Sequence, residues 1–259
     1  MTYIPGMFTK SSPDSKNIPI TDILKSAKHV VVLTGAGISV EGGVPTFRGK
    51  GGLWDRYDIE ECATAEAMAN RPDKVWEMHH ELRKTVADCK PNPAHYTIAK
   101  MEEYYSDFKV VTQNVDNYHR DAGSTEIIEL HGNIWKDKCL KEGTVTINKQ
   151  LPLPELPPKC DNCGGMLRPD VVFFGEQLDP IVLSTAIQAA EFCDLMFVVG
   201  TSAVVQPAAS LPFIAKQHNA FVIEVNIEAT SVSFIADKSY YGKAGEVLPK
   251  LWDEFLSSV

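Results

Sequence analysis

Short apolar runs recur along the chain and predict buried strands. The runs are rich in valine, isoleucine and phenylalanine and do not alternate with polar residues, which is typical of strands covered on both faces in a mostly parallel sheet. Between them lie segments of helical pattern, several of which begin at or beside a proline. The expected strands are Val30–Leu33, Lys109–Thr112, Ile127–Leu130, Val171–Phe174, Leu195–Val199 and Phe221–Val225. The expected helices are Thr21–Ala27, Pro72–Ala87, Ala94–Tyr104, Pro180–Glu191, Pro207–Gln217 and Glu246–Ser257.

The alternation of strand and helix predicts an α/β fold with a doubly wound, Rossmann-like parallel sheet. Two segments interrupt this order. Residues 49–90 form a mostly helical insertion, and residues 136–168 combine three cysteines with the proline-rich sequence LPLPELPPK, which predicts a small inserted lobe. We therefore expect a Rossmann-like domain made of residues 1–48, 91–135 and 169–259, a helical insertion at 49–90 and a zinc-ribbon-like lobe at 136–168.

The composition fits a globular protein and narrows its partners. Of 259 residues, 44% are hydrophobic and 23% are charged, and the formal net charge is -9. An acidic protein repels a phosphate backbone, so we expect no direct binding of nucleic acid. The first residues lack a signal-peptide core, and no apolar run reaches the ~18 residues of a membrane helix. We therefore expect a cytoplasmic protein without a membrane segment. We also expect it to be a monomer.

The sequence VVVLTGAGISVEGGVPTFRG, residues 30–49, begins like a dinucleotide-binding loop. Gly35, Ala36 and Gly37 follow a strand, and glycines in such a turn let backbone N–H groups approach phosphate oxygens. The third glycine of the G-x-G-x-x-G pattern would fall at Val40, and no ribose-binding acid follows at the usual distance. Arg48 is placed to neutralise phosphate. A tight turn with a surface arginine is the alternative interpretation.

Polar residues also follow a second strand, at the edge where open α/β sheets bind ligands. Gln113, Asn114 and Asp116 offer two amides and an acid there, which can hold a carboxamide and a water. A capped loop is the alternative, because Asn and Asp are common turn residues.

Two further strand ends add candidate chemistry. His131 ends a strand at the same expected edge, and a histidine titrates near neutrality, so it is the natural candidate for a general base. Gly200, Thr201 and Ser202 lie between a strand and a helix, where they can cap the helix or contact ribose and phosphate.

Cysteine spacing indicates a metal site. Cys160 and Cys163, followed by two glycines, form half of a zinc-knuckle pattern, and Cys139 is the expected third ligand. The residue at the fourth place is Glu142, so the fourth ligand is Glu142 or water. A lobe that no longer holds metal is the alternative. In a chain without an export signal we expect all six cysteines to be thiols or metal ligands rather than disulfides.

Ten sequence strings, taken together, resemble the sirtuin family. In chain order they are GAGIS, GVPTFRG, GGLW, TQNVD, HRDAGS, LHG, CDNC, RPDVVFFGE, GTSAVVQPAA and VIEVN, spanning residues 35 to 226. Ten strings in one order make coincidence negligible. Sirtuins resemble dehydrogenases in fold but consume NAD, so the resemblance implies an NAD-dependent protein-lysine deacylase of the bacterial, class III-like group. Its products would be nicotinamide, O-acyl-ADP-ribose and free lysine.

The resemblance also implies roles for individual residues. His131 would take a proton from a ribose hydroxyl, Asn114 would order water or the ribose, and Asp116 would hold the carboxamide. Phe47 and Arg48 would belong to a loop that presses on the nicotinamide ribose. The implied NAD contacts are Gly35, Ala36, Gly37, Thr46, Phe47, Arg48, Trp54, Gln113, Asn114, Asp116, Gly200, Thr201, Ser202, Asn226 and Ala244. The implied peptide contacts are Val171, Val172, Phe173, Phe174, Gly175 and Glu176.

Two other functions stay open. An NAD hydrolase or mono-ADP-ribosyltransferase would use the same site, and a non-catalytic NAD-binding module would use only its binding part. The complete set of Asn114, Asp116 and His131 weighs against the idle module. The peptide-pairing string VVFFGE would give a pure hydrolase no benefit.

Departures from the family pattern touch the cofactor rim and the acyl pocket. The family often has serine at the place of Gly42 and DGLH at residues 116–119. Sirtuins that remove succinyl or malonyl groups carry a tyrosine and an arginine where this chain has His79 and Leu82. Leu82 belongs to the apolar stripe of its helix, so the pocket lacks a cation for an acidic acyl group. We expect a preference for acetyl or longer neutral acyl groups, unless a helix shift brings Arg83 inward.

Overall fold

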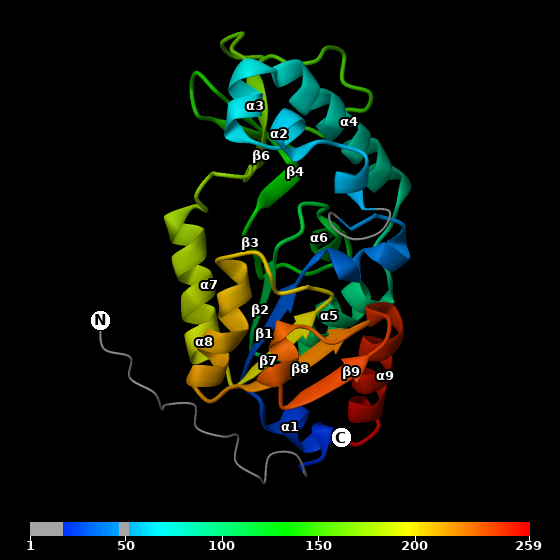
Figure 1. The fold of residues 1–259 in the computed structure, drawn as a ribbon. Helices are drawn as coiled ribbons and strands as arrows, with labels where there is room; N and C mark the ends of the chain where they lie inside the picture. Colours follow the sequence, from blue (N-terminus) through cyan, green and yellow to red (C-terminus); the bar gives the residue numbers. More distant parts are fainter. Residues whose placement is uncertain (1–17, 47–51) are drawn as a thin grey trace, which may run out of the picture.

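The computed structural model describes residues 18–46 and 52–259 of the protein, and its centre is a six-stranded parallel sheet (Figure 1). The strand order is β3-β2-β1-β7-β8-β9. The chain adds strands on one side of β1 and then, from β7, on the other, so the order reverses between β1 and β7. The strands are β1 His29–Thr34, β2 Asp107–Thr112, β3 Ile127–Glu129, β7 Leu195–Val199, β8 Phe221–Asn226 and β9 Lys238–Tyr241.

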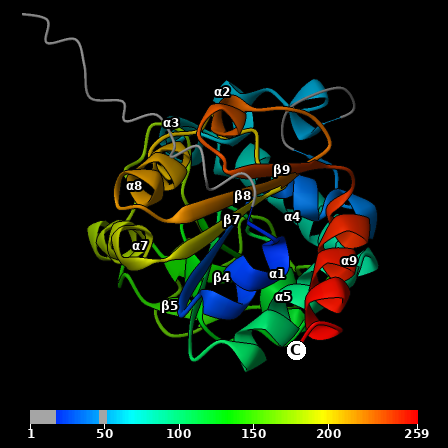
Figure 2. The same ribbon diagram turned by 90° about the horizontal axis from the view of Figure 1, so that it is seen from below.

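Helices cover both faces of this sheet, as Figures 1 and 2 show. Successive residues of β1 point to opposite faces: Val32 packs with the first group of helices and Leu33 with the second. The first group comprises α1 Ile20–Ser26, α5 Pro93–Tyr104 and α9 Ala244–Leu256. The second comprises α7 Pro180–Phe192 and α8 Leu211–Gln217. Because both faces are buried, the continuous apolar runs of the sequence are explained.

A helical segment between β1 and α5 leads away from the sheet. It contains α2 Ile59–Cys62, α3 Ala65–Asn70 and the long α4 Pro72–Asp88. Asp58 and Thr64 cap the first two helices by accepting backbone N–H bonds, and α4 begins with proline. The helix expected at Pro72–Ala87 corresponds to α4.

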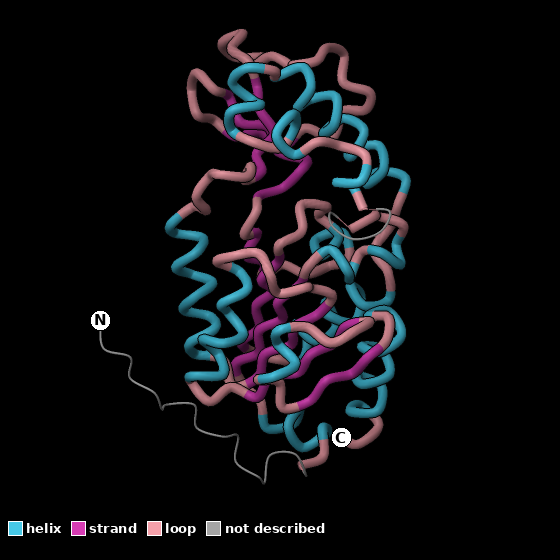
Figure 3. The backbone as a smooth tube through the Cα atoms, in the orientation of Figure 1, coloured by secondary structure: helices cyan, strands magenta, loops and turns pink. Residues whose placement is uncertain are grey.

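The small lobe is built on an antiparallel sheet of three strands in the order β5-β4-β6. These are β4 Gly132–Cys139, β5 Val145–Ile147 and β6 Leu167–Val171, and Figure 3 shows that much of the remaining lobe is loop. The helical segment packs against it: Trp76 of α4 donates from Nε1 to the Leu167 carbonyl at 2.9 Å. The small sheet extends beyond residues 136–168 at both ends.

One expected strand is wrong. The run Val171–Phe174 was assigned to the parallel sheet, but β6 ends at Val171 and pairs with β4 of the small lobe. The run is apolar because Phe173 packs with Trp76 and the lobe core rather than within the large sheet. The sixth strand of the parallel sheet is instead β9, whose residues are mostly half-buried at the sheet edge.

The α/β class, the parallel sheet and the small cysteine-bearing lobe are confirmed. Short 3₁₀ helices complete the described chain: η2 Ala36–Ile38, η3 Val40–Gly42, η4 Leu53–Asp55, η5 Ala208–Ser210 and η6 Ser231–Phe234, with the one-turn helix α6 Tyr118–Asp121. Within the described ranges, no helix has the length and apolar character needed to cross a membrane.

Candidate functional site

Two glycine-containing loops meet where the strand order reverses. Gly37 follows β1 and Gly200 follows β7, and the Gly37 amide donates to the Gly200 carbonyl at 2.7 Å. A Cβ built on Gly200 would lie 2.3 Å from the Ile38 nitrogen, and Gly200 has a φ of 59°. Because an L side chain fits neither the space nor the dihedral, this position requires glycine. At Gly35 the space alone is limiting, because a Cβ there would lie 2.7 Å from the Thr201 Cβ. The predicted nucleotide loop is therefore a close-packed turn at the ligand-binding edge of the sheet.

Thr201 joins three strand ends at this edge. Its hydroxyl accepts a hydrogen bond from Gln113 Nε2 at 3.0 Å, and its carbonyl accepts one from Asn226 Nδ2 at 2.9 Å. The neighbouring Ser202 is exposed, and Ala244 is buried at the start of α9. The structure thus brings together polar residues that the sequence separates by more than 100 positions.

Asn114 lies buried beneath the glycine loop. Its Nδ2 donates to the Gly35 carbonyl at 3.2 Å and to Ser39 Oγ at 3.4 Å. Its Oδ1 has no hydrogen-bond partner among the described residues. Leaving a buried acceptor unpaired costs about 1–3 kcal/mol, so this oxygen favours a ligand or water that donates a hydrogen bond. A ribose hydroxyl meets that requirement, and the residues here therefore fit NAD.

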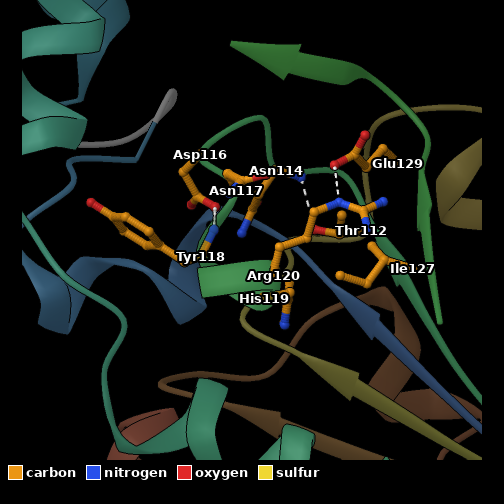
Figure 4. Close-up of a pocket in the computed structure, with 9 residues that line it drawn as sticks. All are labelled: Thr112, Asn114, Asp116, Asn117, Tyr118, His119, Arg120, Ile127 and Glu129. Carbon is orange, nitrogen blue, oxygen red and sulfur yellow. Dashed lines mark hydrogen bonds and ion pairs between the residues drawn. The ribbon is translucent and has the colours of Figure 1, made fainter. Parts of the chain in front are cut away.

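Asp116 is a buried carboxylate next to Asn114 (Figure 4). Its Oδ2 accepts from Ser39 Oγ at 2.7 Å, and its Oδ1 accepts from the Tyr118 amide at 3.0 Å. Burial raises the pKa of Asp116, and the bond from Ser39 opposes that rise. The surrounding cavity measures about 10 Å³, roughly the room that one water molecule needs. Asp116 is therefore held in one orientation by the protein itself.

The geometry of His131 leaves one ring nitrogen free to act as a base. Its Nδ1 lies 2.9 Å from the Gln113 carbonyl oxygen, which can only accept, so Nδ1 carries the hydrogen. Nε2 then has the lone pair. Burial lowers the pKa of His131, so the ring is neutral at pH 7. The next residue, Gly132, has a φ of 81°, and a Cβ there would lie 2.1 Å from the Asp170 carbonyl oxygen.

The segment proposed to bind peptide starts beside His131. The Val172 amide donates to the His131 carbonyl at 3.0 Å, and the Phe174 amide donates to the Ala63 carbonyl at 2.9 Å. The segment therefore lies between the general-base candidate and the helical segment. Glu176 is directed toward the protein, because its carboxylate binds both terminal nitrogens of Arg168 at 2.7 and 2.9 Å.

Among the described residues of α4, the buried face carries no free cation near the expected acyl-pocket positions, His79 and Leu82. His79 donates from Nδ1 to the Val75 carbonyl at 2.8 Å, and burial lowers its pKa to about 4, so the ring is neutral at pH 7. Leu82 packs in an apolar cluster with Val44 and Leu53. Arg83 is fully buried and pairs with Asp137 of β4 at 2.5 Å. The inward shift of Arg83 that the sequence left open would break this ion pair.

Buried neutral histidines make the stability of this fold sensitive to acid. Burial lowers the pKa values of His79 and His95 to about 4, against about 6.5 in the unfolded chain. Between these pH values the unfolded chain binds protons that the folded chain does not, so stability is complete above pH 6.5 and falls as the pH drops toward 4. At pH 5 each of these histidines lowers the free energy of unfolding by about 2 kcal/mol relative to neutral pH. Urea unfolding at pH 7.5 and 5 measures this, and His95→Gln should show a smaller loss. An unchanged loss in that variant would contradict the assignment.

The lobe gathers four potential metal ligands. The sulfurs of Cys139, Cys160 and Cys163 and a carboxylate oxygen of Glu142 all lie within 4.8 Å of one another. The sulfurs of Cys139 and Cys163 are 3.5 Å apart, which suits two thiolates on one zinc with bonds of about 2.3 Å. The donor set therefore fits zinc. All six cysteines are free thiols in the structure, in line with the sequence.

Some expected site residues cannot be placed, and others were missed. Phe47 and Arg48 lie outside the described residues, and Trp54 is described only as part of η4. Thr46 accepts a backbone bond from Leu53 at 2.9 Å. Ser39 was missed although it belongs to the string GAGIS. Trp135, whose Nε1 donates to the Asp116 carbonyl at 3.3 Å, was missed because nothing in the sequence indicates that contact.

A Rossmann-like sheet with glycine turns and a neutral histidine at the carboxyl ends of its strands is typical of nucleotide-dependent enzymes of the α/β class. Comparison with known proteins gives the family. Residues 35–207 match the model of the Sir2 family. The NAD-dependent protein deacylase 2 of Pyrobaculum aerophilum is 49% identical over 235 residues, which cover 91% of this chain and 94% of the relative. The chain belongs to the Sir2 family, the sirtuins, as its sequence strings predicted.

Solved structures agree with this assignment. A Sir2 homologue in complex with NAD is 44% identical, with a TM-score of 0.87 and coverage of 96% of both chains. A Sir2 protein with a deacetylated p53 peptide and 3′-O-acetyl ADP ribose is 33% identical, with a TM-score of 0.83 and coverage of 91% of this chain and 96% of that one.

Two departures from the family pattern, Gly42 and the pair Asn117 and Tyr118, lie next to each other in the structure. A Cβ on Gly42 would lie 2.5 Å from the Lys90 carbonyl oxygen, so a serine there would require the chain to shift. Tyr118 passes close to Gly42, and its hydroxyl donates to the Val86 carbonyl of α4 at 2.9 Å. Asn117 has a φ of 76°, a conformation that asparagine tolerates and glycine adopts freely. The loop that holds Asp116 is thereby tied to α4.

Proposed function

We propose that this protein removes acyl groups from lysine side chains of proteins and consumes NAD in the reaction. The observation that carries the proposal is His131, whose fixed tautomer leaves a basic nitrogen on a residue that is bonded both to Gln113 at the nucleotide edge and to Val172 of the segment 171–174. The membership of the Sir2 family and the NAD-dependent deacylases among its relatives support it. NAD supplies a ribose carbon that can release nicotinamide and a ribose hydroxyl that can take over the acyl group.

The chain's own residues would divide the work as follows. The loops around Gly37 and Gly200, with Thr201, would bind the nucleotide at the switch point. Asp116, fixed by Ser39 and Tyr118, would orient the carboxamide of nicotinamide. Asn114 Oδ1 would accept a hydrogen bond from the ribose or an ordered water.

His131 would accept the proton, and the substrate peptide would bind beside it. Its Nε2 would take the proton of the ribose hydroxyl, and Nδ1 would keep its hydrogen bond to the Gln113 carbonyl throughout. Residues 171–174 would add the substrate peptide as an extended strand. Zinc would be held by the cysteine lobe, where it would stabilise the lobe's fold.

The surroundings of α4 support a preference for neutral acyl groups. A buried carboxylate needs a partner charge, and His79 is neutral at pH 7 while Arg83 is already paired with Asp137. Leu82 contributes only apolar contacts at this wall. Burying an acetyl or longer neutral chain in such a pocket costs little free energy. The carboxylate of a succinyl group would be buried there without a partner cation, which is unfavourable.

Matched peptides test the activity and the preference together. We expect O-acyl-ADP-ribose, detected by mass spectrometry, only when NAD and an acyl-lysine peptide are both present. The kcat/KM for acetyl and butyryl peptides should exceed that for succinyl by about tenfold or more, which corresponds to about 1.4 kcal/mol. Leu82→Arg should raise the ratio of succinyl to acetyl turnover, with Leu82→Met as the neutral control.

Two outcomes would contradict these statements. Nicotinamide release that ignores the peptide would identify an NAD hydrolase instead. A succinyl preference in the unmodified protein would overturn the acyl assignment alone. That the protein is a cytoplasmic monomer stays a prediction from the sequence, and light scattering of the purified chain would test its oligomeric state.

A further inference from the structure

The small lobe that carries Cys139, Cys160 and Cys163, here called the metal lobe, departs from an all-thiolate site at one position. Glu142 follows Cys139 at the same spacing that separates Cys160 from Cys163, so it occupies the fourth corner by sequence. It also does so in space, because Glu142 Oε2 lies 3.8 Å from the Cys160 sulfur. The backbone amide of Glu142 donates to the Cys139 sulfur at 3.4 Å, which fixes the turn that carries it.

A neighbouring amide holds the Glu142 side chain. Nδ2 of Asn162, which lies between the other two cysteines, donates to Oε1 at 2.9 Å and to Oε2 at 3.1 Å. Glutamate is a long side chain that loses considerable rotamer freedom when it is fixed. The bonds from Asn162 restrict that freedom in advance and direct the carboxylate toward the three sulfurs. Polar partners that orient a ligand in this way tune the affinity of metal sites.

We propose that Glu142 is the fourth ligand of a three-thiolate, one-carboxylate metal site, and that Asn162 is the positioning residue that orients it. A carboxylate is a harder donor than a thiolate. The site therefore binds zinc less tightly than four thiolates would. Zinc binding also depends on the Asn162 side-chain amide, which orients Glu142 and which a cysteine at position 142 would not need.

Four variants of the full-length chain test this proposal. They are Glu142→Gln, Asn162→Ala, Glu142→Cys and the double variant Glu142→Cys with Asn162→Ala. Zinc affinity is measured by competition with a chromogenic chelator. Cobalt(II) is then titrated into metal-free protein, because its sulfur-to-metal charge-transfer absorbance counts the thiolates that bind it.

The expected results separate the two roles. Asn162→Ala should weaken zinc binding by about 10–100-fold, the usual effect of removing an orienting partner. Glu142→Gln should weaken it at least as much. Glu142→Cys should tighten binding and raise the charge-transfer absorbance by about one third, because four thiolates replace three. In the Glu142→Cys background, the change at Asn162 should have little effect.

Two results would overturn the proposal. If Glu142→Gln and Asn162→Ala bind zinc as the unmodified chain does, the fourth ligand is solvent. If Asn162→Ala weakens binding equally in the Glu142→Cys background, Asn162 only supports the fold of the lobe. Circular dichroism of each zinc-loaded variant checks that it is folded. Because the readout is metal binding, the result stands independently of whether the protein is a deacylase.

Discussion

The variant His131→Ala is expected to lose about 10²- to 10⁴-fold in kcat while its affinity for NAD stays near that of the unmodified protein. A general base lowers the barrier of the step in which it takes a proton and adds little to ground-state binding. The half-buried ring makes one side-chain bond among those described, to the Gln113 carbonyl, so its removal should leave the fold intact. Steady-state kinetics with an acetyl-lysine peptide and titration with NAD measure the two quantities separately.

The pH profile gives a second measure of the same group. Burial lowers the pKa of His131. In the unmodified protein, the midpoint of the acid limb of the kcat/KM profile should therefore lie below pH 6.5. The base is active when neutral, so activity rises with pH through that limb. His218→Ala removes an exposed histidine at the C-cap of α8 and serves as the control, with unchanged turnover. Near-normal turnover in His131→Ala would show that another group is the base.

Arg83→Met is expected to destabilise the protein by about 3–5 kcal/mol, the largest loss of stability that we predict. Arg83 and Asp137 are both fully buried, and their ion pair joins α4 to β4. Nε of Arg83 also donates to the Ile134 carbonyl at 2.8 Å, and its guanidinium lies 5.2 Å from the Trp76 ring centre. Without the arginine, the one side-chain bond left to the buried Asp137 carboxylate within the described part of the chain is that from Asn148. Urea unfolding monitored by tryptophan fluorescence measures the loss.

A double variant separates the buried charge from the packing. Replacing both partners, as Arg83→Met with Asp137→Leu, should recover much of the loss, because an apolar pair of similar volume avoids the unpaired charge. Lys84→Met on the same helix is the control: its ion pair with Glu81 is exposed, and such pairs contribute little. If the double variant is as unstable as Arg83→Met, the arginine acts through its packing rather than its charge.

The central part of the fold was predictable because burial on both faces leaves a direct mark on sequence. The strands β1, β7 and β8 are largely apolar runs, with Glu224 as the charged exception in β8, and were found close to their true bounds. The edge strand β9, with the sequence KSYY, has no such run because most of its residues are only half-buried. The misplaced segment 171–174 shows the limit of this argument. An apolar run indicates burial, but it does not say against which sheet.

The site was predictable where the chemistry resides in adjacent residues and less so where it depends on contacts. The glycine loops and the cysteine pair can be found in the sequence, since their spacing serves the function. The neutral state of His79 arises from burial by the surrounding fold, and the burial of Arg83 depends on Asp137, 54 residues away. Neither the neutral state of His79 nor the burial of Arg83 can be predicted from a local sequence pattern. The tautomer of His131 likewise follows from a carbonyl on another strand.

The strand β4 determines how far the metal lobe is from the reacting atoms. It begins directly after His131 and ends at Cys139. Seven residue steps of about 3.3 Å each give a separation of up to about 23 Å between the two ends. A paramagnetic ion such as cobalt(II) in the lobe would therefore act as a remote probe. Its effect on nuclear relaxation at the His131 ring would report how the lobe and the catalytic edge move relative to each other during turnover.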